Sequence, residues 1–287
     1  MKRCTYCGKE YSDSFVQCSV DGTVLINEEP PFLPPIIEPP ATAPENPVSF
    51  SPAVPVMTRA ISDRRLRIFE LSLVCVVAVG SSLLLAIYSL FEELPNNLGG
   101  HLRWLNGVVH EISALALLWY VLLRRSRSFA DIGFNRRWSD LGWSLILWFG
   151  GGIASGGIYR LIYYSGLTPV AEREVTEHVT HFLFGGGVFI GTLAFQCINP
   201  FFEELIVRAY VTTEVRELTN SVWKAVVFST VLQTSYHLYQ GIPMTIAIGA
   251  EFFLWSLFYA KTNRITPIIL AHLYADVGPT LWHMLRH

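Results

Sequence analysis

The sequence predicts an all-α protein that crosses a membrane several times, on the strength of its composition, its hydropathy and its long apolar runs. Hydrophobic residues make up 51% of the 287 residues, and charged residues only 15%. An average soluble domain carries about 25% charged residues, so this chain has too few to cover a surface that faces water. Mean hydropathy is +0.38, and apolar runs dominate from about residue 63 onward. These features favour a polytopic bundle of transmembrane helices.

Seven apolar stretches after residue 63 fit transmembrane helices. A bilayer core of about 30 Å requires roughly 20 mainly apolar residues in a helix. The expected spans are 68–91, 104–123, 141–165, 182–202, 222–236, 242–260 and 265–285. The fifth stretch is short for a full span. Six or eight spans stay open as alternatives to seven, because half-spans are common in proteins of this kind.

Positive charge is distributed unevenly between the predicted loops, which indicates an orientation. Lys and Arg residues precede the first span, follow the second and separate the sixth from the seventh: Arg64, Arg65, Arg67, Arg124, Arg125, Arg127, Arg136, Arg137, Lys261 and Arg264. Cytoplasmic loops of membrane proteins are enriched in Lys and Arg. We therefore expect the N-terminus in the cytoplasm and the C-terminus outside.

Two segments of different composition precede the predicted membrane domain, residues 63–287. Residues 27–62 contain ten of the sixteen prolines. A stretch so rich in proline favours an extended linker, partly in the polyproline II conformation. Residues 1–26 are polar and contain three of the five cysteines, and we expect them to form a small module.

The N-terminal module resembles the small zinc ribbons found at the start of many bacterial membrane proteins. Cys4 and Cys7 form a Cys-x-x-Cys knuckle, and Cys18 follows with Asp21 in the place of a fourth cysteine. A carboxylate oxygen is an acceptable zinc ligand, so these four side chains are expected to hold a structural zinc ion. A degenerate ribbon that binds no metal is the alternative. A ribbon on a flexible linker favours docking of a cytoplasmic protein partner.

Net charge and cysteine placement argue against other classes of protein. The formal net charge is −2, and the chain lacks the broad basic patch that nucleic-acid binding requires. The cysteines do not form the pattern of a disulfide framework. We therefore expect the lipid bilayer as the surroundings and no nucleic acid as a partner.

Ionisable side chains within or at the ends of the predicted spans mark the candidate site. Placing each in a membrane costs roughly 2.5–3.5 kcal/mol, which makes each a functional hypothesis. Three groups stand out: Glu203, Glu204 and Arg208 after the fourth span, His237 at the end of the fifth, and His272 with Asp276 in the seventh. The i,i+4 spacing predicts that Glu204 pairs with Arg208 and leaves Glu203 free. Glu111 and Glu251 either line the same cavity or pair inside the bundle.

Together the three groups resemble the signature of the CPBP family. That signature is E-E-x-x-x-R, then a distal His, then H-x-x-x-N/D, each on a separate helix. The family includes the type II CAAX prenyl endopeptidases and bacterial proteins linked to bacteriocin processing and self-immunity. The resemblance covers about residues 140–285. In one departure, Gln233 stands four residues before His237, where the family usually has Phe.

The resemblance implies an intramembrane endopeptidase with six functional positions. They are Glu203 as the catalytic carboxylate, His237 as its partner in activating water, His272 and Asp276 as oxyanion-stabilising or water-positioning groups, and Glu204 and Arg208 as supporting residues. Peptide hydrolysis requires a base for water and a donor for the developing oxyanion, and these side chains can supply both.

The active site could also depend on a metal ion. A catalytic zinc ion needs about three protein ligands and one open position, and His237, His272 and Glu203 or Asp276 could provide them. The family is often called a metalloprotease, yet a metal-free glutamate mechanism has also been argued for it, and the sequence leaves both open. An ionised Asp276 cannot donate to an oxyanion, so orienting His272 or binding a metal is its expected role.

The expected substrate is a membrane-associated peptide or protein. Eukaryotic relatives cleave prenylated CAAX proteins, whereas a ribbon on a linker is more typical of bacteria, where a bacteriocin-like precursor is expected by analogy. The expected location is the bacterial inner (plasma) membrane. One alternative is a non-catalytic adaptor or scaffold that docks a partner through its ribbon. A second is a small-solute transporter, for which inverted-repeat symmetry would be expected.

Overall fold

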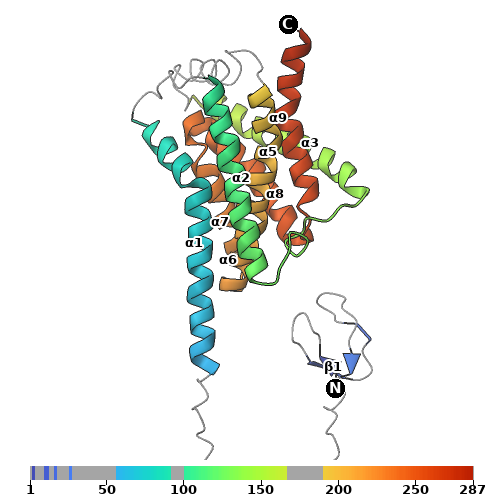
Figure 1. Cartoon of the computed structure of the whole chain (residues 1–287). Coiled ribbons are helices and arrows are strands. Elements are labelled where there is room, and N and C mark those ends of the chain that lie inside the picture. The colour runs from blue at the N-terminus through green and yellow to red at the C-terminus, as the bar shows by residue number, and fades with distance from the viewer. Residues whose placement is uncertain are drawn as a thin grey trace, which may run out of the picture. The chain divides into compact units, whose positions relative to one another are not determined.

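The computed structural model describes residues 2–3, 10–12, 16–17, 26–27, 56–91, 100–166 and 190–286 (Figure 1). The chain divides into two compact units, Met1–Ala53 and Val54–His287.

The first unit contains a small antiparallel sheet. Its described strands have two residues each: β1 (Lys2–Arg3), β2 (Glu10–Tyr11) and β3 (Ile26–Asn27). Strand β1 lies between the other two, in the order β2-β1-β3. The four candidate zinc ligands lie outside the described residues: Cys4, Cys7, Cys18 and Asp21. The structural zinc ion therefore stays a prediction.

The described part of the second unit is helical, which confirms the predicted all-α bundle. Its elements are α1 (Val56–Tyr88), α2 (Gly100–Arg124), α3 (Ser139–Tyr164), α5 (Ile190–Glu203), the π-helix η1 (Glu204–Tyr210), α6 (Val211–Thr219), α7 (Val222–Ser235), the 3₁₀-helix η2 (Leu238–Gln240), α8 (Ile242–Thr262) and α9 (Thr266–Arg286). Helix α1 begins at Val56, inside the segment 27–62 for which the sequence predicts a linker.

Four of the described helices are long and apolar enough to cross a membrane, where the sequence predicts about seven spans. These segments are Asp63–Tyr88, Trp104–Arg124, Ser139–Tyr164 and Ile242–Thr262. The other predicted spans differ for separate reasons. Segment 182–202 lies only partly within the described residues, α7 has 14 residues, and α9 contains polar groups and Pro279.

The central element of the bundle is the continuous segment formed by α5, η1 and α6. Helices α2 and α9 pack against α5, α7 packs against η1 and α6, and α8 packs against both α3 and α7. All seven residues of η1 are buried. This segment therefore lies in the interior, where polar side chains must find partners within the protein.

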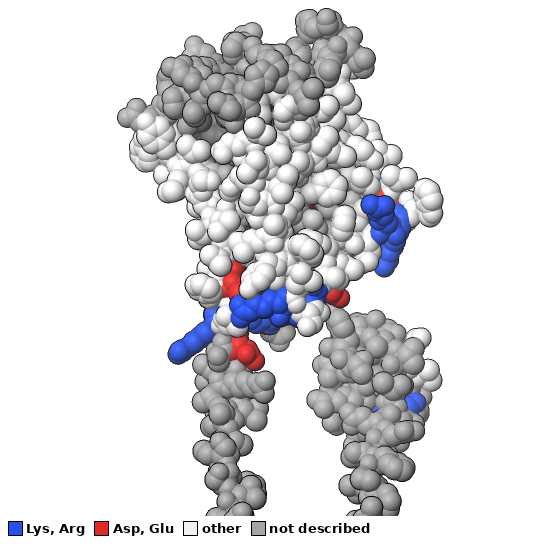
Figure 2. All heavy atoms as spheres, in the orientation of Figure 1, with Lys and Arg blue, Asp and Glu red and all other residues white. Residues whose placement is uncertain are grey.

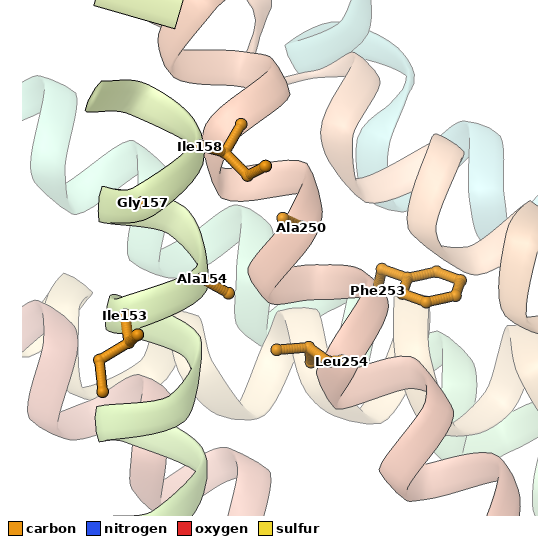
Figure 3. A pocket seen from close by; sticks show the side chains of 7 residues that line it. All are labelled: Ile153, Ala154, Gly157, Ile158, Ala250, Phe253 and Leu254. Carbon is orange, nitrogen blue, oxygen red and sulfur yellow. The ribbon is translucent and has the colours of Figure 1, made fainter. Parts of the chain in front are cut away.

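The outward faces of the spanning helices are apolar. Large exposed side chains include Leu84 on α1, Trp119 on α2 and Ile153 on α3. An apolar groove of about 410 Å³ lies between α3 and α8. Its lining residues are Ile153, Ala154, Gly157, Ile158, Ala250, Phe253 and Leu254 (Figure 3). No ionisable side chain lines this groove. The groove is therefore an apolar feature of the bundle surface.

Charged side chains gather near one end of the bundle (Figure 2). Arginines from α1 and from the end of α2 meet glutamates from α1 and α6 in what we call the rim network: Arg67, Arg124, Arg125, Arg127, Glu70, Glu214 and Glu217. Arg125 contacts both Glu70 and Glu214 and so joins α2 to α1 and α6. The network fastens three helices together at this end of the bundle.

Candidate active site

The junction of α5 and η1 carries the first group of predicted site residues. Helix α5 contains Pro200 and ends at Glu203, and the π-helix begins at Glu204. Pro200 has no backbone N–H and cannot form the usual helical hydrogen bond. Single π-helical turns within α-helices are rare and often occur at functional sites. Here the change of winding sets the directions in which Glu203 and Glu204 leave the helix.

Arg208 forms an ion pair with Glu204, as the i,i+4 spacing predicts. Both side chains are fully buried. The Nη1 of Arg208 also donates to the Phe252 carbonyl oxygen at 2.8 Å and to Ser256 Oγ at 2.6 Å. Its guanidinium carbon lies 5.6 Å from the centroid of the Trp255 ring. These contacts fix η1 to α8 and supply partners for a charge that would otherwise be costly to bury.

Gln233 on α7 connects the two glutamates to Arg208. Its Nε2 donates to Glu203 Oε2 at 2.9 Å and lies 3.4 Å from Glu204 Oε1. Its Oε1 accepts a hydrogen bond from Nη2 of Arg208. The sequence pattern identified this position only as a departure from the family motif. A polar residue in an otherwise apolar helix was the sequence feature that could have indicated a role for Gln233.

His272 on α9 completes what we call the buried cluster: Glu203, Glu204, Arg208, Gln233 and His272. The His272 Nδ1 lies 2.9 Å from Glu204 Oε1. Its Nε2 lies 3.6 Å from Asp276 Oδ2, which is close enough for charge interaction but too long for a hydrogen bond. Asp276 accepts a hydrogen bond from Asn199 Nδ2 at 3.3 Å. Each ring nitrogen of His272 therefore faces a different carboxylate.

His237 lies in the turn after α7 and has a different set of partners. Its Nδ1 lies 2.8 Å from the Gln233 carbonyl oxygen. Because a carbonyl oxygen only accepts, we assign a proton to Nδ1, so that Nε2 is the nitrogen that can carry a lone pair. Within the described part of the chain, His237 forms no side-chain hydrogen bond to the other predicted site residues, but it is within electrostatic range of Asp276.

Comparison with known protein families gives a match that covers the candidate site. Residues 185–278 match the model of the family described as "Type II CAAX prenyl endopeptidase Rce1-like". The match covers about a third of the chain and supports the resemblance to the CAAX-protease (CPBP) family. The matched segment contains all six functional positions that the resemblance implied, from Glu203 to Asp276. Searches of curated proteins and of solved structures gave no match.

One group in the matched segment has the geometry to hold a metal ion. Glu203, Glu204 and His272 each offer a ligand atom, and these atoms lie within 4.8 Å of one another. Two carboxylate oxygens and an imidazole nitrogen form a donor set that suits zinc. Among the described residues this is the group found, and it differs from the set of His237, His272 and Glu203 or Asp276 that the sequence suggested. In this structure both oxygens of Glu204 already have partners in Arg208 and His272.

Further polar groups near the buried cluster fall outside the family motifs. Glu111 on α2 is 2% exposed, and its Oε2 has no hydrogen-bond partner among the described residues. It is within electrostatic range of Glu203, Asp276 and His272. Tyr236 has a buried hydroxyl that lies near Glu203 without forming a hydrogen bond of ordinary geometry.

Glu251 on α8 packs directly against α3. A Cβ atom added to Gly151 would lie 2.6 Å from Glu251 Oε1. The absence of a side chain at Gly151 therefore makes room for this carboxylate. Glu251 is also within electrostatic range of His272 and Arg208. Glu251, like Glu111, thus places a carboxyl group near the candidate site.

Proposed function

We propose that the protein is an intramembrane endopeptidase that hydrolyses a peptide bond in a membrane-associated protein or peptide. The family match of residues 185–278 supports protease activity in general. The observation that carries the specific proposal is the environment of Glu203, a buried carboxylate that receives one directed hydrogen bond from Gln233. Such a carboxylate keeps an oxygen available to act as a base.

Glu203 takes the proton from the attacking water. Its Oε2 accepts the hydrogen bond from Gln233, so Oε1 is the oxygen that receives the proton. His237 orients the same water through Nε2, since its Nδ1 faces a carbonyl oxygen. The water oxygen bonds to the carbonyl carbon of the substrate, and the π electrons of the carbonyl group move onto its oxygen.

His272 stabilises the resulting oxyanion. A ring that carries protons on both nitrogens donates from Nε2, while Asp276 at 3.6 Å compensates its charge. On the opposite side of the ring, Nδ1 contacts Glu204, and Glu204 forms an ion pair with Arg208. The intermediate collapses when the C–N bond breaks, and Glu203 returns its proton to the leaving nitrogen.

A zinc ion, where bound, would polarise the water or the substrate carbonyl group. Glu203, Glu204 and His272 would hold it, because their ligand atoms lie close together. Loss of activity with a chelator and recovery with zinc would support metal dependence. Activity that survives chelation in a metal-free preparation would support the glutamate mechanism.

The N-terminal ribbon is proposed to dock a cytoplasmic partner, with zinc bound by Cys4, Cys7, Cys18 and Asp21. The proposed location is the bacterial inner membrane with the N-terminus in the cytoplasm. Zinc analysis of the full chain and of a variant without residues 1–26 tests the ribbon. We expect the deletion to remove one zinc ion per chain. Equal zinc content in both proteins would contradict the zinc ribbon.

The proposed activity is tested by comparing protein N-termini in membranes of cells that carry the wild type or Glu203→Gln. We expect new termini only with the wild type, and their sequences would identify the substrate. Glu217→Gln serves as the matched control, because Glu217 lies in the rim network. Identical termini for all three proteins at equal abundance would contradict the protease and favour the adaptor.

A further inference from the structure

Gln233 is a fully buried amide in a place where the family motif usually has an apolar ring. Burying an amide is costly unless its hydrogen bonds are made within the protein. Both ends of the Gln233 side chain have partners in the buried cluster. The polar residue is therefore accommodated by specific contacts, and these contacts go to the groups proposed for catalysis.

The chemistry of the neighbours fixes the orientation of the amide. Arginine carries only donors, so the oxygen of Gln233 must face Arg208. The NH₂ group must then face the carboxylates, where it lies 2.9 Å from Glu203 Oε2. The reversed amide would place a donor against a donor and an oxygen against two carboxylates. Only one orientation satisfies all the partners.

The main chain of Gln233 contacts the other proposed water-activating group. Its carbonyl oxygen lies 2.8 Å from Nδ1 of His237. The same residue therefore holds Glu203 through its side chain and His237 through its backbone. A shift of Gln233 would move both groups or separate them.

We propose that Gln233 is a positioning residue that aligns the Glu203 carboxylate with His237 for the activation of water. This inference rests on the proposed endopeptidase function and goes beyond the family motifs, which do not include a polar residue here. By occupying Oε2 of Glu203, Gln233 directs Oε1 toward the water. The alignment contributes to the chemical step and leaves substrate binding unchanged.

The first test measures cleavage of a farnesylated CAAX peptide by the purified full-length protein. Gln233→Met removes all three hydrogen bonds of the side chain, to Arg208, Glu203 and Glu204. Gln233→Glu keeps the shape and the acceptor for Arg208 but removes the donor to Glu203. We expect kcat to fall roughly 10- to 100-fold in both variants, the factor for losing one hydrogen bond to a charged group. We expect KM to change by less than about twofold, because uniform substrate binding is unaffected.

Gln196→Met is the matched control, because Gln196 is also a buried glutamine and lies on α5. Its Oε1 has no hydrogen-bond partner among the described residues, so its removal should leave kcat near the wild-type value. A kcat for Gln233→Glu within twofold of the wild type, per folded molecule, would overturn the proposal. Equal losses in the Gln233 and Gln196 variants would overturn it as well, because they would indicate a general packing effect.

A second test does not depend on any substrate. Thermal unfolding is measured for the wild type, Gln233→Met, Glu203→Met and the double variant. Residues in direct contact give non-additive changes, and we expect a coupling of about 2–4 °C in Tm. Additive shifts would overturn the inference. If the wild type cleaves no peptide while the coupling is present, the proposed activity on that probe fails and the contact made by Gln233 stands.

Discussion

The buried cluster and the rim network contain the same kinds of charged group in different surroundings. Every nitrogen of the Arg208 guanidinium has an acceptor within the protein, and the side chain is inaccessible to solvent. In the rim network, the side chains of Arg67 and Arg124 are 27% and 44% exposed. Water can replace a lost partner at the rim but cannot do so in the cluster. Identical substitutions should therefore have very different effects in the two regions.

The largest effect is expected for Arg208→Met. It leaves Glu204 buried without its main partner, and breaking a buried pair costs roughly 3–5 kcal/mol. Thermal unfolding and the yield of folded protein measure this loss. Arg208→Lys retains the charge but not the forked geometry, so it should recover only part of the stability. A loss below about 1 kcal/mol for the Met variant would remove the distinction between the two regions.

Arg125→Gln should give the next largest effect. Arg125 is the least exposed arginine of the rim network and contacts Glu70 and Glu214, whose side chains are almost completely buried. We expect a loss of about 1–3 kcal/mol, typical of hydrogen bonds to charged groups. Activity per folded molecule should stay unchanged, because these residues do not contact the buried cluster. A reduced kcat in the folded variant would show that the two regions are coupled.

Asp276→Asn tests charge at the margin of the buried cluster. The variant keeps the size of the side chain but removes the negative charge 3.6 Å from His272 Nε2. We expect kcat to fall by roughly tenfold, equivalent to about 1.4 kcal/mol, with little change in Tm. Full activity in a peptide cleavage assay would exclude a role that requires negative charge at this position.

Glu217→Gln should have the smallest effect, and the size of that effect depends on pH. Burial raises the pKa of Glu217, but hydrogen bonds and charges from Arg67 and Arg127 outweigh burial and leave the pKa below its usual value. Its stabilising contribution is therefore present above the unfolded pKa of about 4.5 and is lost as pH falls through the folded pKa.

The measurement for this variant is Tm between pH 3 and pH 7. Glu217→Gln should lower stability near pH 7 by less than about 1 kcal/mol, since the side chain is partly exposed. The wild type and the variant should converge in acid. Burial of Glu214 raises its pKa despite the surrounding arginines, so the contribution of Glu214 has the opposite sign and is lost as pH rises. Divergence of the two proteins in acid would contradict the assignment for Glu217.

The sequence predicted those features that depend on local spacing and composition. The long apolar runs indicated the helical bundle, and the i,i+4 spacing predicted the pair of Glu204 and Arg208. The number of spans was harder to predict, because α7 and α9 are shorter or more polar than a simple membrane helix. Apolar length alone does not distinguish a spanning helix from one buried within the bundle.

The features that the sequence did not predict depend on contacts between distant segments. Helix η1 is completely buried among α1, α2, α7 and α8, and no local pattern in the sequence predicted its π-helical winding. Gln233 lies 30 residues from Glu203 along the chain. Its polarity was visible in the sequence, but its partners became apparent only when α7 was packed against η1.

The length of α7 bears on how water reaches a hydrolytic site within a membrane. A helix of 14 residues is about 21 Å long, which is shorter than the hydrocarbon core of about 30 Å. Lipids around a short helix are accommodated by local thinning of the bilayer. If α7 starts at one headgroup level and stands upright, the turn that carries His237 would lie within the hydrocarbon core. The bilayer itself would then be indented beside the site, shortening the path by which each turnover's water molecule arrives.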